Sequence, residues 1–233
     1  MNFFFRKKEA VEPKKLELLS VHIPKSAGTS FRNTLKDVYG EKHVVRTDIN
    51  LQNGHLMLNE QPSNPPVLPV DVRVCHGHFR LKEFYNMFPE HEHLPVITWL
   101  RNPVQRIISY YYYLVQQIDQ ELISKDKQQG KWKRMQRTLP EFAGDPRNQN
   151  RMSFFLEGKS IDDYLFVGIT EDYNNDLQRL AKLLNWDKAP YFEENKTRNK
   201  ENVTDQDLIR QIEKWNQQDM DIYNYILNKK KQL

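Results

Sequence analysis

The fold of this chain follows from one stretch near its N-terminus, His22-Ile23-Pro24-Lys25-Ser26-Ala27-Gly28-Thr29-Ser30. The apolar run from Leu16 to Ile23 leads into it and predicts a buried strand. After the loop, Thr29 or Ser30 can cap a helix that runs to Gly40. The stretch therefore predicts a strand–loop–helix unit.

The same alternation continues along the chain. Further strands are predicted at 70–75, 95–100 and 165–169, and helices at 81–88, 104–123, 150–156, 176–184 and 204–227. Residues 48–69 are predicted to form a long loop or a subdomain excursion, and 124–148 a surface loop or an irregular helical pair. Strands that alternate with helices predict an α/β fold with a central, mainly parallel sheet flanked by helices. We expect a flexible lead-in over 1–15 and a single domain over 16–233.

The composition narrows the class of protein. The 233 residues are 38% hydrophobic, which is enough for one core and too apolar for a disordered chain. Because 35 basic and 31 acidic residues leave a net charge of only +4, nucleic acid is not an expected partner. Cys75 is the only cysteine, which excludes an intrachain disulfide. With no apolar run near the roughly 20 residues of a membrane helix and no recognisable signal peptide, we expect a soluble, cytoplasmic protein.

The loop after the first predicted strand has the groups that a phosphate requires. Gly28 lets the backbone approach a ligand, the amides at a helix start point outward, and Lys25 supplies a positive charge. An ordinary strand–helix turn with a solvated lysine explains the same residues equally well. The pattern is not the G-x-x-x-x-G-K-[ST] loop of nucleotide-hydrolysing enzymes, because Lys25 precedes Gly28 by three residues.

A second candidate motif follows the third predicted strand. The stretch from Arg101 to Tyr110 fits R-x-P-x-x-R-x-x-S-x-Y, with Arg101 at the strand end and Ser109 about two helical turns on. A guanidinium makes paired, charge-assisted bonds to phosphate, so both side chains could hold one phosphate group. Alternatively, Arg101 caps the helix and Ser109 is a tolerated polar residue. Arg106 is interpreted as either a ligand or a structural ion-pair residue.

The stretch Cys75-His76-Gly77-His78 lies between the two motifs. His76 and His78 point to the same side of an extended chain, and histidine is the natural base near neutral pH. A structural histidine bonded to backbone is one alternative, and a metal site with His91-Glu92-His93 is another. A metal needs three or four converging ligands, and because the sequence has no longer signature we expect no metal. Cys75 is interpreted as a buried thiol.

These motifs resemble those of the PAPS-dependent sulfotransferases, where PAPS is 3′-phosphoadenosine 5′-phosphosulfate. HIPKSAGTS (22–30) is similar to their 5′-phosphosulfate-binding loop, and the second motif to their 3′-phosphate-binding motif. His-Gly-His is similar to the carbohydrate group that includes heparan sulfate 2-O-sulfotransferase. The resemblance implies a three-layer P-loop-like fold, PAPS as co-substrate and no metal.

The resemblance also implies the role of each site residue. His78 is the first choice for the base and His76 the second, while Lys25 stabilises the charge of the leaving phosphate. The donor-binding residues it implies are Lys25, Ser26, Ala27, Gly28, Thr29 and Ser30 at the 5′ end, Arg101 and Ser109 at the 3′-phosphate, and Thr197 and Arg198 in a loop over the nucleotide.

The predicted function is transfer of a sulfuryl group to a hydroxyl of a carbohydrate by a soluble bacterial enzyme. An acidic polysaccharide could bind basic residues outside the donor motifs, at Lys131, Lys133, Arg134 and Arg137, although a solvated loop explains that cluster more simply. A metal-dependent kinase or NTPase, and a non-catalytic binder of anionic glycans, are the alternative functions. The sequence makes no prediction of the oligomeric state.

Overall fold

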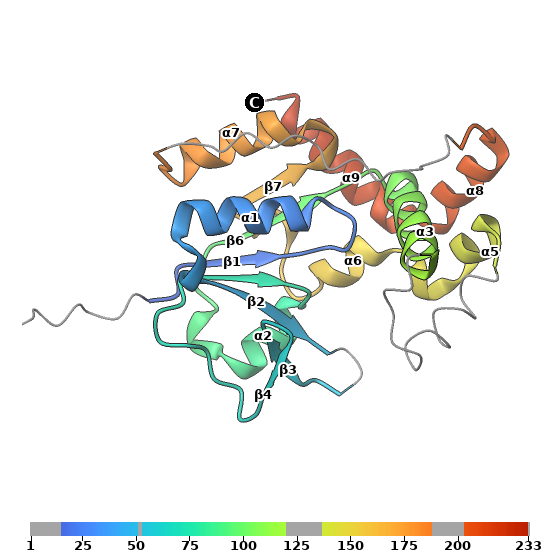
Figure 1. The fold of residues 1–233 in the computed structure, drawn as a ribbon. Helices are drawn as coiled ribbons and strands as arrows, with labels where there is room; N and C mark the ends of the chain where they lie inside the picture. Colours follow the sequence, from blue (N-terminus) through green and yellow to red (C-terminus); the bar gives the residue numbers. More distant parts are fainter. Residues whose placement is uncertain (1–14, 51–52, 120–136, 188–202, 233) are drawn as a thin grey trace, which may run out of the picture.

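A computed structural model describes residues 15–50, 53–119, 137–187 and 203–232 (Figure 1). The strands are β1 (Leu18–Val21), β2 (Val44–Ile49), β3 (Leu56–Leu58), β4 (Gln61–Ser63), β5 (Val74–Gly77), β6 (Val96–Leu100) and β7 (Phe166–Ile169). The helices are α1 (Gly28–Tyr39), α2 (Leu81–Met87), α3 (Pro103–Asp119), α5 (Leu139–Gly144), α6 (Arg151–Leu156), α7 (Tyr173–Leu183), α8 (Gln206–Trp215) and α9 (Gln217–Lys230). Short 3-10 turns lie at η1 (Glu41–His43), η2 (Pro89–His91), η3 (Pro146–Asn148), η4 (Ile161–Asp163) and η5 (Thr170–Asp172).

The strands form one sheet in the order β4-β3-β2-β5-β1-β6-β7. The pairs from β2 to β7 are parallel, whereas β3 and β4 extend one edge as an antiparallel hairpin. Strand β1 is the central one of the five parallel strands, so the chain crosses to one side for β2 and β5 and to the other for β6 and β7. In sheets of this kind ligands bind beyond the carboxyl ends of the strands, where the strand order reverses. That place is between the loops that follow β1 and β6.

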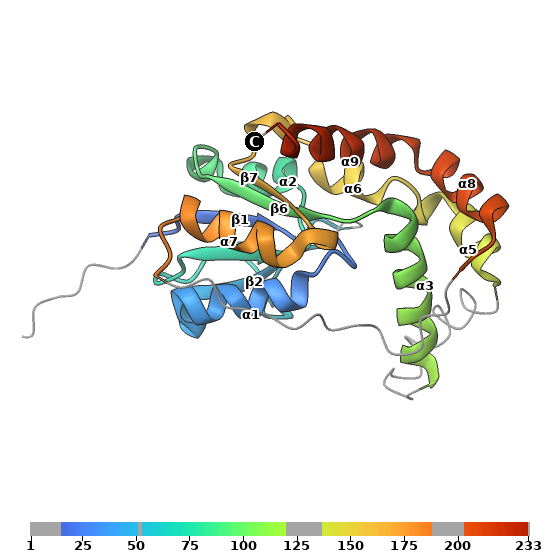
Figure 2. The same cartoon turned by 90° about the horizontal axis from the view of Figure 1, so that it is seen from above.

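Helices cover both faces of the sheet, as Figure 2 shows from above. On one face, Phe31 and Leu35 of α1 and Leu177 and Leu180 of α7 pack on buried strand residues. On the other face, side chains of α2, α6 and α9 form a second core with the opposite side of the same strands. The predicted three-layer, P-loop-like α/β fold is therefore confirmed.

A third cluster of buried residues lies outside the three layers. Ile107 and Ile108 of α3, Phe142 of α5 and Ile212 of α8 are its buried centre. Figure 1 shows α3, α5 and α8 together beyond the carboxyl ends of the strands. This helical lobe thus forms one side of the region in which a ligand is expected. Within the described residues, no helix is both long and apolar enough to cross a bilayer.

Several predicted boundaries were wrong. Of the two interpretations of residues 48–69, the long loop is wrong, because the segment contains the end of β2 together with β3 and β4. The charges of Arg46 and Asp48 obscured β2 in the sequence, yet these side chains form an ion pair with each other (2.7 Å) and leave the apolar positions of the strand buried. Strand β5 begins at Val74 rather than Val70, which is largely exposed.

The predicted final helix, 204–227, is two helices. It breaks at Asn216, a fully buried residue whose side-chain oxygen accepts the backbone N–H of Asn150 (3.0 Å) and whose amide donates to the Ile212 carbonyl (2.8 Å). An asparagine side chain competes in this way for backbone groups that would otherwise continue a helix. The break lets α8 join the helical lobe while α9 packs on the sheet.

Candidate functional site

The loop after β1 has an unusual backbone conformation. Lys25 and Ala27 have φ values of +70° and +55°, in the left-handed region, although neither is a glycine. Each such residue costs about 1–3 kcal/mol and persists only where the surrounding structure holds it, commonly at functional sites. Helix α1 starts directly after Ala27, without a side-chain cap or an acidic residue in its first turn among the described contacts. Its first amides are therefore free to bind an anion.

Gly28 is required for a reason that the sequence did not show. A Cβ atom at this position would lie 1.8 Å from Nε2 of His22, because the imidazole packs directly on the glycine. This contact brings the first turn of α1 close to the end of β1.

Lys25 of the first motif contacts residues at and beyond the second motif. Its Nζ is 4.0 Å from the ring centroid of Tyr113 on α3, a cation–π contact. Its carbonyl accepts a hydrogen bond from Nη1 of Arg101 (3.0 Å). Burial and the neighbouring Arg101 charge lower the pKa of Lys25 to about 8, so the ammonium is still mostly charged at neutral pH. The two anion motifs therefore meet, as expected from their strand-end positions.

Two buried serines in the motifs have unsatisfied hydroxyl groups. The Oγ atoms of Ser26 and Ser109 are buried and have no hydrogen-bond partner within the described part of the chain. Buried hydroxyls are normally bonded, so each of these would gain a partner from a phosphate oxygen. The side chains present thus fit a ligand with phosphate groups at two positions.

Arg106 has a structural role in this molecule. It is almost fully buried and its Nη2 donates to the Asn148 carbonyl (2.8 Å), which ties α3 to the turn before α6. Burial lowers the pKa of Arg106 to about 10. The contact favours a structural role, but its partner is a backbone carbonyl, and the described residues show no ion pair of Arg106.

His76 is held by hydrogen bonds on both ring nitrogens. Its Nε2 lies 3.2 Å from the Gly28 carbonyl and its Nδ1 lies 2.9 Å from Oγ of Ser20. Because a carbonyl only accepts, Nε2 carries the proton and Nδ1 accepts from the serine. Burial, with the nearby His78 and Arg32, lowers the pKa of His76 to about 3. His76 therefore has no free lone pair and stays neutral.

His78 is arranged in the opposite way. Its Nδ1 lies 2.9 Å from Oδ1 of Asp48, and its backbone N–H donates to the same oxygen (2.8 Å). Although burial raises the pKa of Asp48, the hydrogen bonds from His78 and the charge of Arg46 lower it to about 2. Asp48 is therefore a carboxylate and Nδ1 of His78 carries a proton, so that in the neutral imidazole the lone pair lies on Nε2.

A third histidine links the anion loop to His78. The His22 ring centroid lies 4.3 Å from that of His78 and 5.3 Å from that of His76. Burial and these two imidazoles lower the pKa of His22 well below its usual value, so the ring is neutral. Sequence reasoning missed His22 and Asp48 as parts of the site, and the only signal for Asp48 was an acidic residue in the segment interpreted as a loop.

The remaining predicted residues divide into two groups. Thr29 is exposed and Ser30 half-buried in the first turn of α1, beside the anion loop. Thr197 and Arg198 lie outside the described residues, as do Lys131, Lys133 and Arg134. Arg137 is described and its Nη1 pairs with Asp145 in the helical lobe (2.8 Å). Among the described residues no group of three or more His, Cys, Asp or Glu side chains could hold a metal ion.

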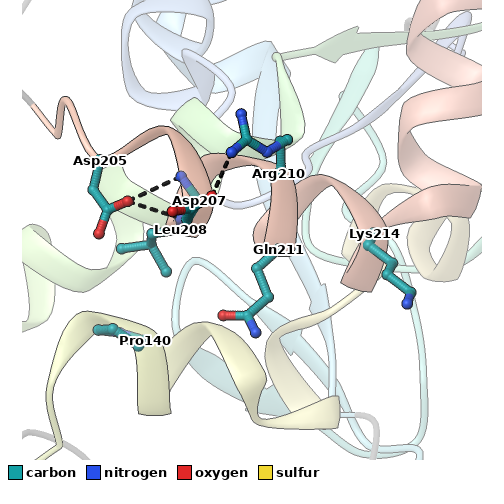
Figure 3. Close-up of a pocket in the computed structure, with 7 residues that line it drawn as sticks. All are labelled: Pro140, Asp205, Asp207, Leu208, Arg210, Gln211 and Lys214. Carbon is teal, nitrogen blue, oxygen red and sulfur yellow. Dashed lines mark hydrogen bonds and ion pairs between the residues drawn. The ribbon is translucent and has the colours of Figure 1, made fainter.

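A groove of about 480 Å³ lies elsewhere, between α5 and α8 (Figure 3). Its charged groups are largely engaged: the carboxylate of Asp205 caps α8, and Arg210 pairs with Asp207. None of the motif residues lines it. We therefore place the candidate site at the β1 and β6 loops and not in this groove.

Comparison with known proteins adds independent findings. The model of the family described as "Sulfotransferase family" matches residues 9–226. A solved structure, of mouse sulfotransferase SULT7A1 complexed with PAP, is similar at 14% sequence identity and a TM-score of 0.46. The match covers 77% of this chain and 62% of the mouse chain. No curated protein matches the sequence significantly.

Proposed function

The chain belongs to the sulfotransferase family, and from that premise we propose that it moves a sulfuryl group from PAPS to a hydroxyl of a carbohydrate. One observation supports this most directly: the hydrogen bond from Arg101 to the Lys25 carbonyl joins the two anion motifs. They meet where ligands bind in sheets of this strand order. A donor with a 3′-phosphate and a 5′-phosphosulfate needs two such sites close together.

The donor is held by the residues of both loops. Lys25, the hydroxyl of Ser26 and the first amides of α1 bind the 5′ end, and Arg101 and Ser109 bind the 3′-phosphate. The unsatisfied hydroxyls of Ser26 and Ser109 support this assignment, because each lacks a protein partner in the described residues. Thr197 and Arg198 complete the donor site in the proposal.

The transfer is a direct, in-line displacement. The acceptor oxygen forms a new bond to sulfur while the bond from sulfur to the bridging phosphate oxygen breaks. The electron pair of the broken bond stays on that oxygen, where Lys25 and the α1 amides stabilise it. The acceptor proton goes to Nε2 of His78, the ring nitrogen whose lone pair is free of the Asp48 contact.

The carbohydrate class of the acceptor rests on the resemblance of His76-Gly77-His78 to the carbohydrate 2-O-sulfotransferases. The imidazole of His78 lies near Phe155 of α6 (6.2 Å between centroids), and the Arg151 guanidinium stacks over the same phenyl ring (5.2 Å). Phe155 is itself buried in the core, so the half-buried Arg151 is the group of this pair whose charge suits an acidic substituent of an acceptor. An acidic polysaccharide is accordingly the first acceptor to test.

Calorimetric titration with adenosine 3′,5′-bisphosphate, with and without magnesium, tests the donor site. We expect binding that does not depend on magnesium and that Arg101→Ala weakens. Arg210→Ala, which removes an exposed arginine of α8 outside the site, is the matched control and should bind normally.

Turnover is then measured with labelled PAPS and an acidic polysaccharide. Transfer of label to the polysaccharide is expected. Magnesium-dependent binding and hydrolysis of ATP, with no binding of the bisphosphate, would instead identify a kinase or NTPase. Binding of the polysaccharide without any transfer of label would identify a non-catalytic glycan binder.

A further inference from the structure

Asp48 forms an unusually complete set of contacts for a residue outside the motifs. One carboxylate oxygen accepts both the backbone N–H and the ring N–H of His78, at 2.8 and 2.9 Å. The other accepts Nε of Arg46 at 2.7 Å. A carboxylate bonded in this way cannot rotate without losing several charge-assisted bonds.

The hairpin at the sheet edge holds this arrangement in turn. Arg46 forms an ion pair with Glu60, and its backbone N–H and carbonyl bond to the side-chain oxygen and backbone N–H of Asn59 (3.0 and 2.8 Å). Asn59 and Glu60 are the β3–β4 turn, and both have positive φ, as a tight two-residue hairpin requires. The chain of contacts thus runs from the hairpin through Arg46 to Asp48 and His78.

Gly77 makes the contact between the two strands possible. A Cβ atom at Gly77 would lie 1.9 Å from the Thr47 carbonyl oxygen and 2.9 Å from Oδ1 of Asp48. The close approach of β5 to β2 therefore needs a glycine between the two histidines. It is this approach that brings Asp48 within reach of the residue after Gly77.

We propose that Asp48 is the positioning residue of His78: it fixes the ring orientation and the tautomer that leaves Nε2 free, and the β3–β4 hairpin serves to hold it. This inference rests on the proposed function, in which His78 is the base. It also assigns a purpose to the antiparallel extension, which contributes no residue to either anion motif.

The tautomer is the direct test and needs no variant. Long-range ¹⁵N–¹H spectra of the wild-type protein report which ring nitrogen of each histidine is protonated. For His78 we expect a proton on Nδ1 and a lone pair on Nε2, and for His76 the reverse. A proton on Nε2 of neutral His78 overturns the inference whatever the turnover data show.

Asp48→Asn extends the test to turnover. The asparagine amide has one oxygen, so it can accept from His78 or from Arg46 but not from both. At the other contact two donors face each other, and the tautomer of His78 is no longer fixed. We expect kcat to fall about 10²-fold, within the full contribution of a general base, while binding of adenosine 3′,5′-bisphosphate stays within about twofold. Asp145→Asn, a carboxylate that binds two arginines and a backbone N–H in the helical lobe, is the matched control and should leave kcat unchanged.

The double variant Asp48→Asn/His78→Ala separates positioning from general destabilisation. Residues that act as a unit are strongly non-additive, so the double variant should be no slower than His78→Ala alone. Losses that multiply overturn the inference and leave His78 as base. If His78→Ala retains full turnover, the proposed base is overturned, and the wild-type spectra still decide whether Asp48 fixes the ring.

Discussion

The two halves of the site differ in how completely their polar groups are satisfied. In the donor half, formed by the loops after β1 and β6 and the start of α3, two serine hydroxyls are buried without a partner among the residues that the structure describes, and two residues have left-handed backbone. In the histidine half, both ring nitrogens of His76 and both oxygens of Asp48 are hydrogen-bonded. The donor half therefore gains contacts when an anion binds, whereas the histidine half is already complete.

The two halves of the site are therefore prepared for their ligands in two different ways. Strained backbone and unsatisfied hydroxyls are tolerated where a ligand supplies the missing partners. A base has to be oriented before its substrate arrives, so its partners must come from the protein. Variants in the two halves should consequently fail in different measurements, and the following predictions are ordered by the size of the expected effect.

The largest effect is expected at His78. His78→Ala removes the proposed base and should lower kcat about 10²–10⁴-fold, the usual contribution of general-base catalysis. Affinity for adenosine 3′,5′-bisphosphate should be unchanged, because His78 belongs to the histidine half. His76→Gln is the comparison, and equal losses of kcat in properly folded His76→Gln and His78→Ala would contradict the division of roles.

Lys25→Ala should lower kcat about 10²–10³-fold, the loss seen when one group that stabilises developing charge is removed. Donor affinity should fall much less, because the charge on the leaving oxygen is greatest in the transition state. Single-turnover kinetics with saturating PAPS measure this directly. A loss confined to donor affinity would make Lys25 a binding residue only.

Lys25 should also set the alkaline limit of activity. Because burial and Arg101 lower the pKa of Lys25 to about 8, the free enzyme loses this positive charge as the pH rises through that value, and kcat/KM should fall. Lys25→Arg keeps its charge, so its kcat/KM should not decline between pH 7 and about 10. An unchanged decline near pH 8 in Lys25→Arg would assign the titration to another group.

Arg101→Ala should reduce the preference for PAPS over its analogue without a 3′-phosphate by about 10–100-fold, from about 1.5–3 kcal/mol for a bond to a charged group. The measurement is the ratio of the two kcat/KM values. Full retention of the preference would place the 3′-phosphate elsewhere.

The smallest effects are expected from His76→Gln, which keeps an Nε2–H for the Gly28 carbonyl but loses the bond to Ser20. We expect the free energy of unfolding to fall by about 1–2 kcal/mol. Urea denaturation measures it, and a variant as stable as the wild type would contradict a structural role.

The stability of the folded protein should decrease at acidic pH. The pKa of His76 is about 3 in the folded protein and 6.5 for an ordinary histidine, so the unfolded chain binds the extra proton between these values. Stability therefore falls as the pH drops from about 6.5 toward 3. In His76→Gln this decline should be shallower, though His22, which is shifted in the same direction, keeps part of it.

The same contrast explains what the sequence could predict. The donor half consists of two local motifs, each within about ten residues, so the resemblance of these motifs to known ones was enough to predict Lys25, Ser26, Arg101 and Ser109 as donor-binding residues. The partner of His78 could not be predicted in this way, because Asp48 lies 30 residues away and meets it only through the parallel pairing of β2 with β5. Strand β2 itself was hard to recognise, because its two charged residues, Arg46 and Asp48, are compatible with a buried strand only when they pair with each other. The mainly parallel sheet was predicted from the alternation of elements, whereas its strand order was not. The hairpin that holds Arg46 left no periodic signal in strands of three residues.

The imidazole of His22 occupies the space that a side chain at position 28 would need. This has a consequence for natural variation. Any residue larger than glycine at position 28 must displace the ring of His22, which contacts the ring of His78. Positions 22 and 28 are therefore not free to change separately, and a serine at 28 should be accepted only with a smaller residue at 22. Homologues that exchange both together would keep the anion loop while altering the surroundings of the base, so this pair is where related enzymes can diverge in acceptor without rebuilding the donor site.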